Sequence, residues 1–176
     1  MKYISAIEFL LFIISCTKGR FISDEGNLVP LTVEKDLSLP AITINGTQFH
    51  AETFGNPANK MLVILHGGPG SDYRYLLNCK AFANNGYYVV FYDQRGSGLS
   101  KRHTQSSYSI QLMIDDLKTV IVHYKTSASQ KIFLLGYSWG AILATAYINQ
   151  NPQSVNGVVL AEPGGFKWQD IKDYVT

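Results

Sequence analysis

Charged residues, cysteines and long apolar runs are all scarce in this sequence. Only 16% of its 176 residues are charged, and its two cysteines cannot form a disulfide framework. The basic residues exceed the acidic ones by a net charge of only +2, and no long basic run occurs, so we expect no nucleic-acid partner. The four histidines lack metal-ligand spacing, so we expect no metal site.

Apolar and aromatic residues are plentiful instead. Hydrophobic residues make up 46% of the chain, which contains 11 Tyr and 9 Phe. This composition disfavours disordered, collagen-like and coiled-coil proteins, and it provides enough material for a globular core without disulfide bonds. At roughly 100–200 residues per domain, the length favours a single domain, and no internal repeat is visible.

The first 15 residues have the outline of a secretory signal peptide. One Lys near the start precedes an apolar run over 9–14, which is far shorter than the roughly 20 residues of a membrane-spanning helix. A small residue, Ser15, precedes Cys16, which resembles the bacterial lipobox, where the cysteine becomes lipidated. We therefore expect a lipid anchor at Cys16 and a location in the cell envelope; an ordinary secretory leader is the alternative. Cys79 is then the remaining thiol, expected to be a small core residue.

Residues 16–39 mix charges with Gly and Pro, which predicts a tether or an arm that covers a sheet edge. Residues 40–176 carry the signals of a folded domain. Short β-prone arms around Asn45 and Gly46 predict a hairpin. Compact apolar runs predict strands at 60–65, 87–92, 131–135 and 156–161, and helices are expected at 73–84, 110–124 and 138–149.

The helix expected at 110–124 has the clearest periodicity. Apolar residues recur every three or four positions, and Asp115, Asp116 and Lys118 are predicted on the opposite face. Strands that alternate with helices predict an α/β fold, a mostly parallel sheet with helices on both faces. Sites in such sheets lie at the carboxyl ends of the strands, so the residues that follow each strand are the functional candidates.

The segment 136–140 (GYSWG) follows a predicted strand and opens a predicted helix. G-x-S-x-G in this context is typical of a nucleophile elbow, a sharp turn that exposes the serine side chain. Glycine at 136 and 140 removes the Cβ atoms that would collide with neighbouring backbone. Ser138 is therefore the candidate nucleophile; an ordinary Gly-rich turn is the alternative.

The segment 66–70 (HGGPG) directly follows another predicted strand. In this kind of site, the loop after that strand gives one backbone N–H to the oxyanion hole, and the residue after the nucleophile gives the other. We therefore expect Gly68 and Trp139 to be the donors, with Gly67 as the substitute for Gly68. His66 lies at a strand end before the nucleophile, and we expect it to order the loop by hydrogen bonding.

The segment 93–100 (DQRGSGLS) follows a third predicted strand. Asp93 and Arg95 could bind a charged substrate, but we favour a structural role in which they support the neighbouring loop. The glycine spacing matches neither the dinucleotide-binding nor the Walker pattern, so we expect no cofactor.

Together, and in this order and spacing, the segments 66–70, 93–100 and 136–140 resemble the proline iminopeptidase family of α/β-hydrolases. The likeness extends from about residue 42 to residue 165. It implies an α/β-hydrolase fold, an acyl-enzyme on Ser138, an oxyanion hole made by Gly68 and Trp139, and release of an N-terminal proline or similar residue from peptides.

Enzymes of this fold carry their triad in the order Ser, acid, His. No histidine follows Ser138, and the acidic candidates downstream are Glu162, Asp170 and Asp173. By resemblance, the acid and the His come after further strands and a helical cap, so we expect them beyond Thr176 and regard the chain as the N-terminal part of a longer domain. Without a base, Ser138 is expected to have at most residual activity.

Three hypotheses follow from these observations. The chain is the N-terminal part of a lipid-anchored, aminopeptidase-like serine hydrolase that acts on peptides. Alternatively, it is part of an esterase or lactonase of the same fold that acts on small esters or amides. The third hypothesis is a catalytically incomplete remnant or a binding protein that kept the fold. The substrate and the oligomeric state are not indicated by the sequence.

Overall fold

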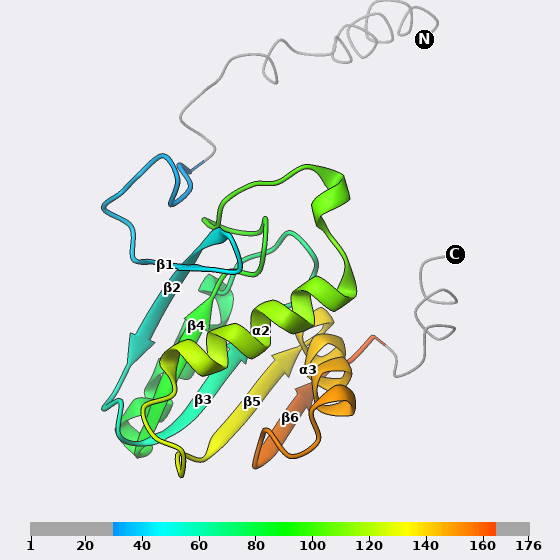
Figure 1. The fold of residues 1–176 in the computed structure, drawn as a ribbon. Coiled ribbons are helices and arrows are strands. Elements are labelled where there is room, and N and C mark those ends of the chain that lie inside the picture. Colours follow the sequence, from blue (N-terminus) through cyan, green and yellow to red (C-terminus); the bar gives the residue numbers. More distant parts are fainter. Residues whose placement is uncertain (1–29, 165–176) are drawn as a thin grey trace, which may run out of the picture. The chain divides into compact units, whose positions relative to one another are not determined.

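The computed structural model describes residues 30–164, which form one twisted six-stranded sheet with strand order β1-β2-β4-β3-β5-β6 (Figure 1). The expected leader over 1–15 and the expected anchor at Cys16 lie outside the described residues. Next to the sheet, the backbone N–H of Val33 donates to Leu99 at 2.8 Å, and Val33 is buried. No helix in the described part of the chain is long and apolar enough to span a membrane.

The sheet begins with the predicted hairpin. Strands β1 (Ala41–Ile44) and β2 (Thr47–Phe54) pair in antiparallel fashion. Asn45 and Gly46 connect them with φ angles of 47° and 70°, the left-handed pair that a two-residue type I′ turn requires. The hairpin predicted from Asn45 and Gly46 is therefore confirmed.

The remaining strands form the parallel centre of the sheet. They are β3 (Lys60–Leu65), β4 (Tyr87–Tyr92), β5 (Ile132–Tyr137) and β6 (Gly157–Ala161). β3 lies between β4 and β5, and β6 follows β5; β2 joins β4 in antiparallel orientation. All parallel strands thus end at the same edge of the sheet, and the three motif segments start there.

Helices cover both faces, as the alternating sequence pattern predicts. Helices α2 (Ile110–Tyr124) and α3 (Trp139–Gln150) lie in front of the sheet in Figure 1, and their apolar side chains share a core with Met61, Val63 and Leu65 of β3. The intervening β3 residues, Leu62 and Ile64, point to the opposite face. Two 3₁₀ helices, η2 (Arg74–Asn85) and η3 (Gln105–Ser107), complete the elements, and η2 covers that opposite face.

One expectation about α2 is wrong. Asp116 was predicted on the face opposite the apolar stripe, but its side chain is 2% exposed. It accepts two hydrogen bonds of 2.7 Å from the guanidinium of Arg95 and a third from Asn45. A buried carboxylate is tolerable when its charge is paired in this way, and helical periodicity alone does not reveal such a partner. Asp115 is exposed, as predicted.

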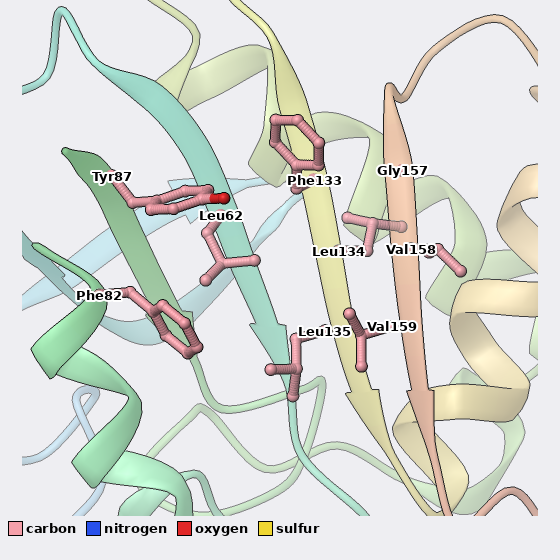
Figure 2. A pocket seen from close by; sticks show the side chains of 9 residues that line it. All are labelled: Leu62, Phe82, Tyr87, Phe133, Leu134, Leu135, Gly157, Val158 and Val159. Carbon is pink, nitrogen blue, oxygen red and sulfur yellow. The ribbon is translucent and has the colours of Figure 1, made fainter. Parts of the chain in front are cut away.

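An apolar groove is lined by residues outside all three motif segments (Figure 2). It has a volume of about 270 Å³ and is bounded by η2 on one side and β6 on the other. Phe82 of η2, Phe133 of β5 and Val159 of β6 are among the lining residues. The one ionisable side chain among its described lining residues is the phenol of Tyr87.

Candidate active site

Ser138 occupies a strained turn between β5 and α3. Its backbone has φ 51° and ψ −118°, a conformation that residues with a Cβ rarely adopt. The N–H of Ser138 donates to the carbonyl of Ala161 at 2.9 Å, which attaches the turn to the end of β6. A Cβ at Gly136 would overlap the carbonyl of Gly140, and one at Gly140 would overlap the carbonyl of Leu65. The geometry is that of a nucleophile elbow.

Two backbone N–H groups in the segments around Ser138 have no acceptor within residues 30–164. Trp139 is the first residue of α3, where an N–H has no partner within the helix. Gly68 lies in the loop after β3 with φ 51°, and among the hydrogen bonds of residues 30–164 its N–H has no acceptor. The N–H of Gly67, by contrast, donates to the hydroxyl of Tyr75. Gly67, the sequence-based substitute for Gly68, is therefore already engaged.

The position of Gly67 brings this loop close to Ser138. A Cβ placed on Gly67 would lie 3.1 Å from the Cβ of Ser138 and 3.0 Å from the hydroxyl of Tyr75. Both distances are tighter than ordinary van der Waals contacts, so glycine favours this close approach. The loop after β3 and the turn after β5 are thus in contact, as expected for segments that leave neighbouring parallel strands at one edge.

His66 orders this loop, as the sequence predicts. The imidazole is fully buried; its Nε2 accepts the backbone N–H of Gln94 at 2.9 Å, so Nδ1 carries the proton and donates to the carbonyl of Gly67. Burial lowers the pKa of His66, which favours the neutral ring that this arrangement needs. Because both ring nitrogens are engaged, His66 is not available as a base for Ser138.

The segment 93–100 has the structural role expected for it, but its two charged residues act separately. Asp93 accepts hydrogen bonds from the ring of His50 and from the backbone N–H groups of Tyr73 and Leu99. Arg95 instead pairs with the buried Asp116 of α2. Both residues are buried, so neither offers a charge to a substrate.

Sequence reasoning missed Gln94, which connects the loops around the nucleophile. Its side chain donates to the carbonyl of His66 at 2.8 Å and accepts the indole N–H of Trp139 at 3.0 Å. The sequence shows only that Gln94 lies in the segment after a buried strand. That position does not reveal its hydrogen-bond partners, His66 and Trp139.

An aromatic and acidic rim borders the nucleophile. The rings of Tyr75 and Tyr137 pack edge to face, with centroids 5.7 Å apart. The hydroxyl of Tyr137 donates to Glu162 at 3.0 Å, and this bond raises the pKa of Tyr137. Glu162 has φ 48° at the end of β6. Of the three acidic candidates, the structure describes only Glu162, while Asp170 and Asp173 lie outside the described residues.

The remaining histidines have partners elsewhere. His50 contacts Asp93, and His103 hydrogen-bonds to the hydroxyl of Thr47 at 2.6 Å. His123 is exposed at the end of α2 and packs against Tyr124. Within residues 30–164, no three metal-binding side chains come together. The described site therefore holds a serine in a strained turn and two N–H groups without an acceptor within residues 30–164, but shows no imidazole in contact with the serine.

Comparison with known proteins places residues 56–173 within the family model described as serine aminopeptidase, S33. Among curated proteins, a proline iminopeptidase of Saccharolobus solfataricus is 36% identical over 105 residues, which cover 59% of this chain and 33% of that protein. Epoxide hydrolase B of Mycobacterium tuberculosis is 33% identical over 121 residues, which cover 67% of this chain and 33% of that enzyme. The chain thus spans about a third of the length of these curated relatives.

Solved structures show the same similarity. A proline iminopeptidase-related protein from Thermus thermophilus superimposes with a TM-score of 0.60 at 25% identity, over 68% of this chain and 42% of that one. An epoxide hydrolase from Vigna radiata gives a TM-score of 0.60 at 26% identity, over 68% and 38% of the two chains.

Proposed function

The chain belongs to the serine aminopeptidase family of α/β-hydrolases, and from this premise we propose that Ser138 is the nucleophile of a peptidase that releases N-terminal residues such as proline. The observation that carries the proposal is the strained backbone of Ser138. Ser138 adjoins Trp139 and lies against the loop that contains Gly68, and the N–H groups of these two residues have no acceptor within residues 30–164. Strain of this kind persists where the surrounding structure over-determines it, and it concentrates at functional sites.

The proposed chemistry is acyl transfer. The Oγ of Ser138 attacks the carbonyl carbon of the substrate, and the carbonyl oxygen becomes an oxyanion that accepts hydrogen bonds from Gly68 and Trp139. Each such donor stabilises the transition state by about 3–4 kcal/mol when it is preorganised. The leaving amine departs with a proton, and water then releases the acyl group from the serine.

A general base is needed to take the proton of Ser138, and the four histidines of the chain all precede Ser138 in the sequence. His50 and His66 are held in buried hydrogen bonds. The proposal therefore assigns the base, and the acid that orients it, to residues that follow Thr176 in a longer chain, as the length of the relatives supports.

Chemical rescue tests the proposed nucleophile independently of the base. A fluorophosphonate probe should label Ser138 slowly in the 176-residue chain, and added imidazole should accelerate labelling because it supplies a base. Ser138→Ala should abolish the label, whereas Ser106→Ala, which changes an exposed serine of η3, should not. Mass spectrometry locates the label; no labelling of Ser138 at any imidazole concentration would refute the proposal.

The substrate class is tested by turnover of the longer chain. A proline anilide and a simple aryl ester compete for the same serine, and the aminopeptidase proposal expects a higher kcat/KM for the anilide. A preference for the ester would replace the peptidase by an esterase or lactonase. A longer chain with neither activity would favour a remnant or binding protein.

We also propose that Cys16 is lipidated and anchors the protein in the cell envelope. The support is the short apolar run followed by Ser15 and Cys16. Metabolic labelling with an alkyne fatty acid should modify the wild-type protein but not Cys16→Ala, and Cys79→Ala should retain the label. Equal labelling of wild type and Cys16→Ala would contradict the anchor.

A further inference from the structure

Gln94 is a buried residue whose carboxamide donates one hydrogen bond and accepts another within the candidate active site. It is 2% exposed and lies at the start of the loop after β4. Its carboxamide N–H donates to the carbonyl of His66 at 2.8 Å, and its carboxamide oxygen accepts from the indole of Trp139 at 3.0 Å. Its backbone N–H donates to the ring of His66 at 2.9 Å.

These contacts join the two segments that carry the free N–H groups. Trp139 carries one of them on its own backbone, and His66 precedes Gly68, which carries the other, by two residues. The two segments leave β3 and β5, whereas Gln94 comes from β4, so the link is made by a third part of the chain. The start of α3 is also packed closely against the end of β3, since a Cβ at Gly140 would overlap the carbonyl of Leu65.

A carboxamide of this length fits both contacts. The carbonyl of His66 requires a donor, and the indole N–H of Trp139 requires an acceptor. A carboxylate would accept from Trp139 but repel the carbonyl of His66. An apolar side chain would leave the buried carbonyl of His66 and the half-buried indole N–H of Trp139 without these partners. Such unpaired groups favour rearrangement of the segments that carry them.

We propose that Gln94 is a positioning residue that fixes the separation of the N–H groups of Gly68 and Trp139. The inference rests on the proposed oxyanion hole and deepens it. Two donors on separate loops stabilise one developing oxyanion only if their spacing matches it. Gln94 sets this spacing by holding the His66 backbone with its donor and the Trp139 indole with its acceptor.

The first test reads the geometry by NMR and needs no activity. In Gln94→Met, the amide signals of Gly68 and Trp139 should shift, and the indole proton of Trp139 should exchange with solvent at least about tenfold faster, because its acceptor is gone. Gln130→Met is the matched control, since the carboxamide of Gln130 also hydrogen-bonds to another segment, donating to the backbone carbonyls of Pro57 and Asn59 at the opposite end of β5. It should leave these signals unchanged.

A Gln94→Glu variant adds a pH signature that a merely structural role would not give. The neutral carboxylic acid can donate and accept as the amide does, but the carboxylate can only accept. The signals of Gly68 and Trp139 in this variant should therefore move toward the wild-type positions as the pH falls and the side chain becomes protonated. Gln94→Met should show no such return.

The second test reads the reaction through a double-mutant cycle. Gln94→Met and Trp139→Phe should each slow imidazole-assisted labelling of Ser138 by about 10- to 100-fold, since a misplaced group costs about this much. Because both changes remove the same link, the double variant should be no slower than the worse single variant. Gln130→Met should label at the wild-type rate.

The outcomes separate the two proposals. If wild-type Ser138 never reacts, the proposed nucleophile fails, while the NMR comparison still decides the role of Gln94. Unchanged Gly68 and Trp139 signals in folded Gln94→Met would overturn the positioning role, and so would fully multiplicative effects in the labelling cycle. If Gln94→Met does not fold, the pH-dependent return of the signals in Gln94→Glu decides.

Discussion

The backbone of Ser138 is held in a strained conformation. A residue with a Cβ at φ 51° and ψ −118° costs about 1–3 kcal/mol relative to relaxed backbone, whereas glycine adopts positive φ readily. The turn is held by the bond from the Ser138 N–H to Ala161 and by the close contacts of Gly136 and Gly140. The fold therefore favours glycine at the one position where the proposed chemistry requires serine.

The first prediction follows from this strain. Ser138→Gly should increase the free energy of unfolding by about 1 kcal/mol relative to Ser138→Ala, because only the glycine variant relieves the strained φ. Urea unfolding of both variants measures the difference. A glycine variant that is no more stable than the alanine variant would show that the turn is not strained.

The second prediction concerns the buried imidazole of His66. Burial lowers its pKa in the folded protein below the usual 6.5, so the unfolded chain binds more protons as the pH falls. The stabilisation from neutral His66 is thus fully present above pH 6.5 and is lost as the pH falls toward the lowered value. The urea midpoint should decrease over this range, and ring NMR signals of His66 should titrate below 6.5. Titration of His66 at or above 6.5 would contradict the prediction.

Among the elements, α2 is attached to the site by one buried ion pair. Arg95 and Asp116 form two hydrogen bonds of 2.7 Å, and both side chains are almost fully buried. Loss of one partner leaves the other charge buried and unpaired, which is more costly than the net value of the pair.

The third prediction is that Asp116→Asn lowers the free energy of unfolding by about 3–5 kcal/mol. Asp115→Asn is its matched control, because Asp115 is the neighbouring, exposed residue of the same helix, and it should change stability by less than about 0.5 kcal/mol. Chemical denaturation measures both. Similar effects of the two substitutions would mean that the buried ion pair contributes no more to the free energy of unfolding than an exposed carboxylate does.

The difference between local signals and long-range partners explains which features the sequence predicts. Strand and helix positions follow from local signals: Asn45 and Gly46 specify a turn type, and the apolar run of β3 is buried on both faces, so its limits coincide with the prediction. The burial of Asp116 and the link made by Gln94 depend on partners far away in the sequence. Local periodicity carries no information about such pairings, so sequence reasoning misplaces or misses them.

For the whole described molecule, the sheet is unequally covered. Helices α2 and α3 close one face, but η2 covers only part of the other, and the groove in Figure 2 extends over β5 to β6. Val159 in this groove is 57% exposed, and β6 is one of the two edge strands of the sheet within residues 30–164. Exposed apolar surface and an unpaired strand edge both favour association.

The fourth prediction is that Val159→Lys reduces binding of a hydrophobic dye and self-association of the 176-residue chain without loss of stability, because the side chain is largely exposed. Val122→Lys is the matched control, since Val122 is 64% exposed on α2, outside the groove. Light scattering and dye fluorescence measure the effects. Equal effects of both substitutions would show that the groove is not the associating surface.

The parallel order of the strands has a kinetic consequence. Met61 pairs with Ile132 and Leu62 with Phe133. The loop after β3 and the turn that contains Ser138 therefore become neighbours only when strands separated by about half of the described chain have paired. Contacts between residues so distant in sequence form late, because closing a long loop must precede any gain from pairing. The proposed nucleophile therefore does not exist in a nascent or partly folded chain, and reactivity of Ser138 would report completion of folding.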